Sequence, residues 1–227
     1  MKQEEELRQL DDLIQSRSIL NHPFYQAWQR GTLSLTQLAT YAKTYYPHVA
    51  AFPGYLQSAI NGANDPLIRS ELEDNLADEL SNPAPHHELW KDFGCGVGLK
   101  RESFGGEPVT DSTRRTVEVF SKLAARETVG ALAALYAYES QQPSVSKTKM
   151  EGLQKFYGVT DKRALAYFEV HAEKDIEHSA GERKAMRQCL NNGASSQTVL
   201  DAAKQALDAY WDLLDGVCEK AGIDVVC

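Results

Sequence analysis

The chain has 227 residues, 42% of them hydrophobic, and a formal net charge of −8 with a pI near 5.3. With no basic cluster denser than Arg114–Arg115, this acidic balance argues against nucleic-acid binding, which requires basic patches. No apolar run approaches the roughly 18 residues of a membrane span, and the acidic start at residues 1–6 lacks the apolar core of a signal peptide. We therefore expect a cytoplasmic protein that binds neither nucleic acid nor membrane.

Apolar periodicity and capping signals predict helices along almost the whole chain. Residues 7–14 indicate an amphipathic N-terminal helix, and Pro23 lies in the first turn of a second helix. A capping box at residues 34–37 opens a longer helix, which Pro47 and Pro53 should kink or break.

The pattern continues beyond this helix. Asp65 and Pro66 begin a helix that ends near Glu79, and residues 82–85 form a proline-rich loop. The next helix runs from His86 to Gly94. Further helices are expected at 111–122, 128–142, 149–157, from Thr160 to Asn191, and 199–217, with loops at Gly94–Gly98 and Gly105–Pro108. Without a convincing strand, repeat or linker, residues 1–227 are expected to form a single all-α domain, a bundle of seven to eight helices.

The four cysteines show no spacing typical of a zinc or redox site. They are Cys95, Cys189, Cys218 and Cys227. In a reducing compartment we expect all four to be free thiols.

The most informative pattern is H-x3-D-x2-H, formed by His171, Asp175 and His178. On an α-helix these side chains fall within an arc of roughly 60°. The arc borders an apolar stripe, which consists of Leu165, Phe168, Ala172 and Ile176. Two imidazoles and a carboxylate beside a buried face are costly unless a partner compensates them. A transition metal such as iron, manganese or zinc would do so.

A metal site needs further ligands, and three residues are candidates. Pro83 and Pro85 prevent one helix from carrying both Glu79 and His86, but the loop could fold His86 back beside Glu79. Glu139 follows a long apolar stretch and is expected to be buried. Three carboxylates and three histidines are the ligand inventory of a dinuclear iron or manganese centre. No histidine follows a Glu by three residues, which disfavours a ferritin-like arrangement.

Several runs of the chain resemble the CADD family, the death-domain-associating proteins of the haem-oxygenase-like di-metal oxidase superfamily. These runs are Asn21–Trp28, Tyr45–Pro53, Asp78–Glu79 with His86–Trp90, Tyr138–Pro143 and His171–His178. Together they span the chain nearly from end to end. The chain is also distantly similar to the pyrroloquinoline-quinone-forming oxidase and the thiaminase II proteins, which share the fold.

The resemblance implies a haem-oxygenase-like bundle that holds two metal ions, Fe/Fe or Mn/Fe, and uses O2 with an external reductant. The implied ligands are Glu79, His86, Glu139, His171, Asp175 and His178. His87 is then not a ligand, because the register with Leu89 and Trp90 places the family histidine at His86. A homodimer is also implied.

The activity that the resemblance implies is formation of para-aminobenzoate for folate synthesis. In this family a tyrosine of the protein itself is the proposed carbon source and a lysine the nitrogen donor. Those positions fall on Tyr25 and Lys149. An amine deprotonated by burial could attack the oxidised phenol ring. Tyr41, Tyr45 and Tyr138 could relay electrons.

Three other functions stay open. The first is a di-metal oxidase that acts on an external small molecule. The second is a metal-free enzyme of the same fold, either a cofactorless quinone-forming oxidase or a hydrolase in which Cys189 or Cys218 is the nucleophile. The third is a death-domain-type interaction protein, although such a role does not explain six matched ligands.

Overall fold

Helices make up the regular structure of residues 2–105 and 109–224, the part of the chain that the computed structural model describes. The α-helices are α1 (Lys2–Ser16), α2 (Pro23–Arg30), α3 (Leu35–Gly62), α4 (Pro66–Ser81), α5 (His86–Gly96), α6 (Asp111–Ala124), α7 (Thr128–Glu139), α8 (Gln142–Phe156), α9 (Lys162–Asn191) and α10 (Ser196–Ala221). Two 3₁₀ turns are η1 (Ile19–Asn21) and η2 (Arg101–Ser103). These residues contain no strand, which confirms the all-α class, and they form ten α-helices where seven to eight were expected.

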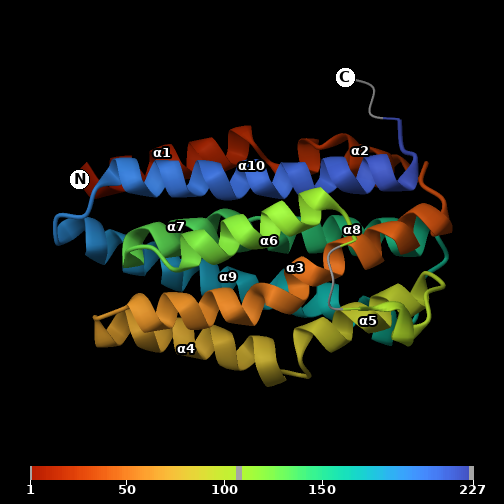
Figure 1. The fold of residues 1–227 in the computed structure, drawn as a ribbon, viewed down its shortest axis with the longest axis horizontal. Coiled ribbons are helices and arrows are strands. Elements are labelled where there is room, and N and C mark those ends of the chain that lie inside the picture. The colour runs from red at the N-terminus through yellow and green to blue at the C-terminus, as the bar shows by residue number, and fades with distance from the viewer. Residues whose placement is uncertain (1, 106–108, 225–227) are drawn as a thin grey trace.

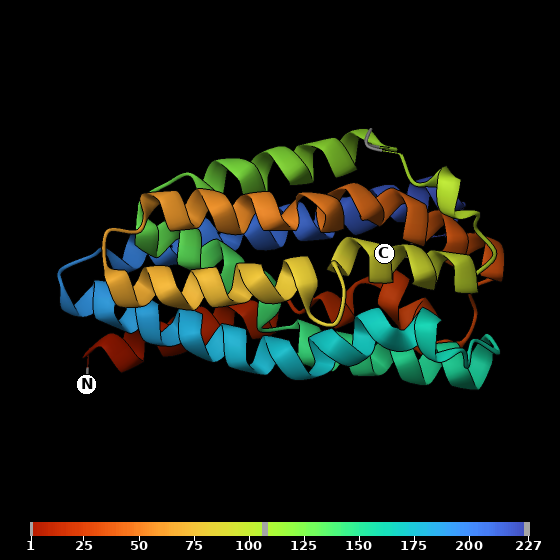
Figure 2. The ribbon, with the colours of Figure 1, turned by 90° about the horizontal axis from the view of Figure 1, so that it is seen from below.

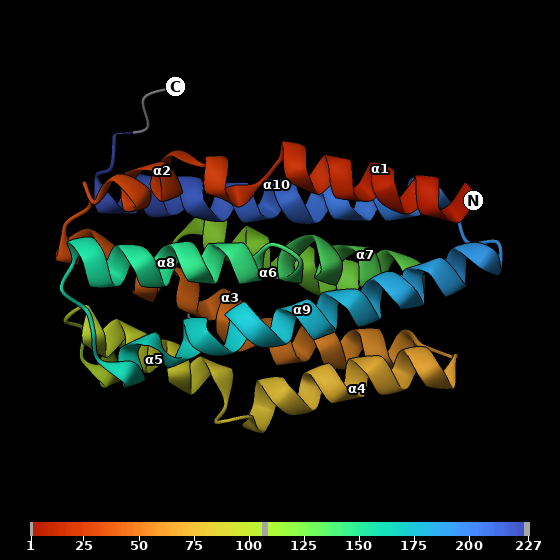
Figure 3. The ribbon, with the colours of Figure 1, turned by 180° about the vertical axis from the view of Figure 1, so that it is seen from behind.

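The helices lie roughly along one long axis (Figure 1). α1 and α2 run beside α10 at one edge, and α4 and α5 lie at the opposite edge. α9 packs against α5, α7, α8 and α4, and the view from behind shows it crossing between α8 and the α4–α5 pair (Figure 3). The view from below shows α4 side by side with α9 (Figure 2). The long helix α9 therefore connects the α4–α5 edge of the bundle to α7 and α8.

Local chemistry explains where the helices begin. The Ser34 Oγ accepts a hydrogen bond from the Gln37 N–H at 3.2 Å while the Gln37 side chain accepts from the Ser34 N–H, which completes the predicted capping box. Asp65 caps α4 with Pro66 at its first position. The cap of α9 is Asp161, not Thr160, because its carboxylate accepts from the Arg163 N–H.

α3 runs without a break through Pro47 and Pro53. Proline removes a backbone donor and normally costs a helix about 3 kcal/mol. Pro47 leaves the Lys43 carbonyl without its helical donor, and side chains from other helices bond the carbonyls on either side of it. The Trp90 indole donates to the Ala42 carbonyl at 2.7 Å, and the Thr113 hydroxyl donates to the Thr44 carbonyl at 3.1 Å.

Other boundaries also differ from expectation by a few residues. α8 begins at Gln142, because Pro143 fits its first turn rather than interrupting it. α5 continues to Gly96. The loop expected at Gly105–Pro108 lies mostly outside the described residues, as does Cys227. Of the apolar stripe expected on α9, Leu165, Phe168 and Ala172 are buried, whereas Ile176 is 54% exposed.

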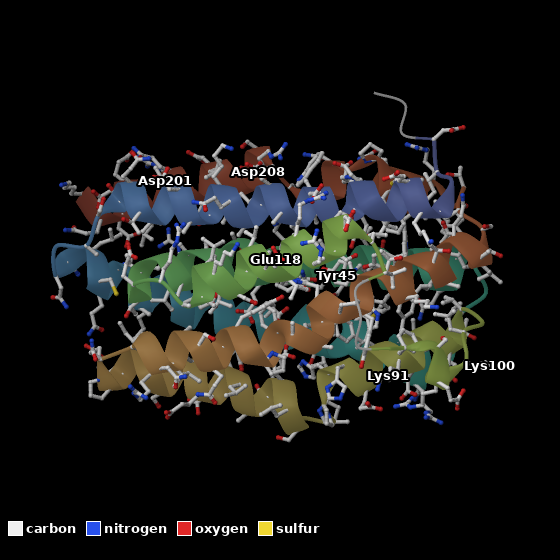
Figure 4. The ribbon with its side chains drawn as sticks, viewed as in Figure 1. Tyr45, Lys91, Lys100, Glu118, Asp201 and Asp208 are labelled. Carbon is white, nitrogen blue, oxygen red and sulfur yellow. The ribbon has the colours of Figure 1, made fainter. Side chains whose placement is uncertain are left out.

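The interior of the bundle is aromatic. Its largest fully buried side chains include Trp28, Trp90, Tyr25, Tyr41 and Tyr45. Tyr45 lies within the bundle, whereas Asp201 and Lys100 lie on its outside (Figure 4). Among the described residues, no helix combines the length and the apolar character that crossing a membrane would need.

Candidate metal centre

The first cluster of candidate ligands joins three helices. Glu79 comes from α4, His86 from the start of α5 and His171 from α9, and all three are buried. One ligand atom from each lies within 4.8 Å of the others. The Glu79 Oε1 is 3.0 Å from the His86 Nδ1 and 3.5 Å from the His171 Nε2. We call this group triad A.

The loop between α4 and α5 makes triad A possible. Residues 82–85 interrupt the helix, and the first turn of α5 brings His86 beside Glu79 although Pro83 and Pro85 forbid one continuous helix. The Asn82 carbonyl oxygen lies 3.1 Å from the His86 Nε2, so the same loop also orients the imidazole.

A second cluster lies nearby on α9 and α7. Glu139 is the last residue of α7, and Asp175 and His178 follow His171 on α9 by one and two turns. The His178 Nδ1 is 3.5 Å from the Asp175 Oδ1 and 3.7 Å from the Glu139 Oε1. Candidate ligand atoms of these three residues also lie within 4.8 Å of one another. We call this group triad B.

Each histidine has an outer partner that fixes its free nitrogen. The Nδ1 of His171 lies 2.7 Å from the Tyr167 carbonyl oxygen, and the Nε2 of His86 faces the Asn82 carbonyl. A carbonyl only accepts, so these nitrogens carry protons, and in the neutral imidazole the other nitrogen is then the lone-pair donor. The Nε2 of His178 is 3.2 Å from the Asp78 carboxylate. Histidines that ligate metals characteristically show this outer bonding.

The inner atoms of the triads lack hydrogen-bond partners in the described part of the chain. These atoms are the His86 Nδ1, the His178 Nδ1 and the Asp175 Oδ2. A buried polar atom without a partner is costly, and such atoms are rare in native proteins. Imidazole and carboxylate donors in this arrangement fit iron, manganese or zinc.

The histidines and carboxylates of the triads shift one another's pKa values. Burial alone would raise the pKa of Glu79, but the neighbouring His171 and His86 imidazoles outweigh it and lower that pKa to about 2. Burial opposes the charged form of His171, yet Asp175 and Glu79 raise its pKa to about 9. The pKa of His178 is likewise raised to about 9, by Asp175 and Glu139 against its own burial. The charged forms of His171 and His178 thus offset part of the carboxylate charge in the two triads.

Three polar residues beside the triads were missed at the sequence level. Asn75 donates to both carboxylate oxygens of Glu139, at 2.9 and 3.2 Å. Asp78 holds the outer nitrogen of His178, and Glu182 is buried beside Glu139. The spacing of Glu182, four residues after His178 and on the same helix face, was the one signal that could have found it. His87 is half-buried, and its Nε2 lies 3.2 Å from Glu88.

Lys149 lies in an aromatic cage next to Tyr25. It is 1% exposed, and its Nζ is 5.5 Å from the centre of the Tyr25 ring. Four other rings surround the amine at 5.2–5.7 Å, those of Tyr41, Tyr45, Trp90 and Phe168. Burial lowers the pKa of Lys149 to about 7, so a large fraction of the amine is neutral at neutral pH. Burial also raises the pKa of Tyr25, which therefore stays a neutral phenol.

Aromatic side chains connect triad A to this cage. The Tyr167 ring stacks on His171 with centroids 4.0 Å apart and meets Trp90 at 4.8 Å. Trp90 stacks on Tyr45 at 5.0 Å, and Tyr45 meets Tyr41 at 5.3 Å. The Tyr41 hydroxyl is 3.2 Å from that of Tyr25. The Tyr138 hydroxyl accepts from that of Tyr45 at 3.0 Å.

Comparison with known proteins agrees with this architecture. Residues 39–211 match a family described as iron-containing redox enzymes. Over 95% of the chain, 37% of residues are identical to a 4-aminobenzoate synthase of Chlamydia muridarum, of which 91% is covered. A 4-aminobenzoate synthase of Nitrosomonas europaea is 36% identical over 97% of this chain and 94% of its own. The crystal structure of a CADD-like protein of unknown function from Nostoc punctiforme superposes with a TM-score of 0.76 at 21% identity, covering 97% of this chain and 99% of that one.

The chain therefore belongs to the iron-containing redox enzymes, and it is a metal-using enzyme with a haem-oxygenase-like fold. Within that class it is CADD-like, and the curated relatives that it matches over nearly their whole length carry the name 4-aminobenzoate synthase.

Proposed function

We propose that this chain is an O2-activating di-metal oxygenase that forms para-aminobenzoate, with its own Tyr25 as the carbon source and Lys149 as the amine donor. The observation that carries the proposal is the Lys149 amine, buried without an ion pair, 5.5 Å from the Tyr25 ring. A buried lysine with a lowered pKa is partly neutral near pH 7, and the neutral amine can act as a nucleophile. The relatives at 36–37% identity are named for the same product.

Triad A and triad B would each hold one transition-metal ion, Fe/Fe or Mn/Fe, through the six residues predicted from the sequence. When bound, these ions supply the O2 chemistry, with electrons from an external reductant. The outer partners of the histidines keep the inner nitrogens aimed at the ions. The burial of five of the six side chains, all but half-buried His178, limits the access of water to the site.

Tyr25 suits the role of carbon source. Its ring and Cβ together have the seven carbons of para-aminobenzoate, with the oxygen in the para position where the product carries nitrogen. Its phenol shares a hydrogen bond with Tyr41, a route by which the proton could leave when the ring is oxidised. The aromatic series from Tyr25 through Tyr41, Tyr45, Trp90 and Tyr167 would carry the electron toward His171.

Lys149 then acts as the amine. Its neutral form has a lone pair within the cage, and helix α8 fixes its distance from Tyr25. The Trp28 indole donates to the Lys149 carbonyl at 3.3 Å, which ties the backbone of this turn to α2, the helix that carries Tyr25. Donor and acceptor are thus pre-positioned by packing.

Isotope labelling tests the proposal directly. Protein carrying ¹³C-tyrosine or ¹⁵N-lysine is loaded with Fe(II) and Mn(II), reduced and exposed to O2 in unlabelled buffer. We expect at most one para-aminobenzoate per chain, with seven heavy carbons from labelled tyrosine and one heavy nitrogen from labelled lysine. The intact protein mass falls correspondingly.

Two variants test whether Tyr25 supplies the carbon and Lys149 the nitrogen. Tyr25→Phe and Lys149→Met should each abolish the product, whereas Tyr55→Phe should retain it, because Tyr55 is equally buried but bonds His48 instead. Undiminished product from Tyr25→Phe would contradict self-sacrifice. Unlabelled product formed over many turnovers would favour the alternative of an external small-molecule substrate.

The metal-free alternative that depends on a cysteine nucleophile gains no support from the geometry. Burial raises the pKa of Cys218 to about 11, and burial also raises the pKa of Cys189. A nucleophilic thiol needs the opposite shift. Cys95, Cys189 and Cys218 are free thiols.

A further inference from the structure

We propose that Glu182 is a seventh protein ligand, a carboxylate that joins Glu139, Asp175 and His178 on the metal ion of triad B. The inference depends on the metal centre of the proposed function. It adds a residue for which neither the sequence pattern nor the triads account.

Glu182 is buried beside another acid, Glu139, and has no cationic partner in the described structure. Its side chain is 4% exposed, and neither carboxylate oxygen has a hydrogen-bond partner there. It follows Asp175 by seven residues and His178 by four, so α9 places all three on one face. A buried carboxylate is normally paired, hydrogen-bonded or bound to a metal.

The carboxylates that surround Glu182 also favour a bound cation. Glu182 lies beside Glu139 and Asp175, so three carboxylates share one buried region with a single imidazole, that of His178. A divalent ion would give these carboxylates a common partner, whereas triad A has only one carboxylate for two imidazoles.

Glu182 is within reach of solvent ions as well. It lines, together with His178, a cavity of about 410 Å³ between α4 and α9. Carboxylates surround its mouth, among them Glu71, Asp74 and Glu177, and Lys174 is paired with Asp78 at 3.3 Å. A cation that enters this acidic cavity meets Glu182 and His178 at its wall. The flexible Glu side chain needs only a rotamer change to meet an ion held by triad B.

Metal binding by the whole apoprotein tests the inference without any assay of product. Mn(II) is titrated into wild type, Glu182→Gln, Glu177→Gln and Asp175→Asn in competition with a chromogenic chelator, and bound metal is counted by mass spectrometry of the metal. Glu177→Gln is the matched control, since it removes the same charge from the same helix at the exposed rim. Thermal melting of each apoprotein shows that it folds.

We expect wild type and Glu177→Gln to bind two ions. Glu182→Gln should bind the second ion at least about tenfold more weakly, and Asp175→Asn should lose it as well. Glutamine keeps the size of Glu182 and can still donate a hydrogen bond to Glu139. Unchanged affinity in Glu182→Gln would therefore overturn the ligand role and leave a mere hydrogen-bonding role. In a crystal of the Mn(II) protein, a Glu182 oxygen should lie about 2.2 Å from the metal. Wild type that binds no metal would overturn the metal centre itself, a separate result.

Discussion

Replacing Lys149 by methionine should stabilise the protein while it abolishes the proposed chemistry. Methionine keeps an unbranched chain of similar length in the aromatic cage but has no amine to desolvate. Burial shifts the pKa of Lys149 from 10.5 to about 7. At about 1.4 kcal/mol for each tenfold change in the equilibrium, this shift corresponds to about 5 kcal/mol of lost stability at low pH. We expect Lys149→Met to recover about 3–5 kcal/mol at pH 6.

The stability gained by Lys149→Met should decrease as pH rises. Between pH 7 and 10.5 the unfolded chain keeps a proton on Lys149 that the folded protein has released. The wild type therefore gains stability as pH rises through this window, whereas the variant does not. The difference between them should be constant below about pH 7 and should disappear near pH 10.5. Urea unfolding of the two apoproteins at pH 6, 8 and 10 measures it.

A neighbouring lysine provides the control. Lys147→Met changes the same residue type on the same helix, but at an exposed position, so its effect should stay within about 0.5 kcal/mol at every pH. A Lys149→Met variant that is less stable than wild type at pH 6, or a difference that grows toward pH 10, would refute the buried neutral amine.

Three further predictions concern the metal centre, the thiols and the aromatic core. Metal affinity of the apoprotein should rise with pH up to about 9, because His171 and His178 must release protons to bind; isothermal titration at pH 6.5, 7.5 and 8.5 measures it, and a flat profile would contradict it. Cys218→Ala should keep wild-type product yield, since its thiol has a raised pKa and no nucleophilic role; loss of product with an intact fold would revive the cysteine hypothesis. Trp90→Phe should lose about 1–3 kcal/mol in urea unfolding, because it removes buried volume and the donor to the Ala42 carbonyl; an unchanged midpoint would show that the α3 carbonyl finds another donor.

Sequence signals identified the helices because those signals are local. The cap at Asp65 and the capping box at Ser34 each act within one turn, so they are visible in a few consecutive letters. The break predicted at the prolines of α3 was wrong for the same reason: their cost is local, whereas the packing around this helix, including the bonds from Trp90 and Thr113, comes from far along the chain. The exposure of Ile176, in the middle of α9, likewise depends on which side of this helix its neighbours cover, which periodicity does not report.

In the candidate site, too, sequence predicted the local features and tertiary packing decided the rest. Spacing alone placed His171, Asp175 and His178 on one helix face, and composition supplied the other donor types. Which donors meet is a tertiary fact: α9 gives His171 to one cluster and the other two residues to a second, because α4 with α5 and the end of α7 pack against different turns of it. The cage around Lys149 and the isolation of Glu182 likewise exist only where helices distant in sequence close over them, since burial depends on the assembled bundle.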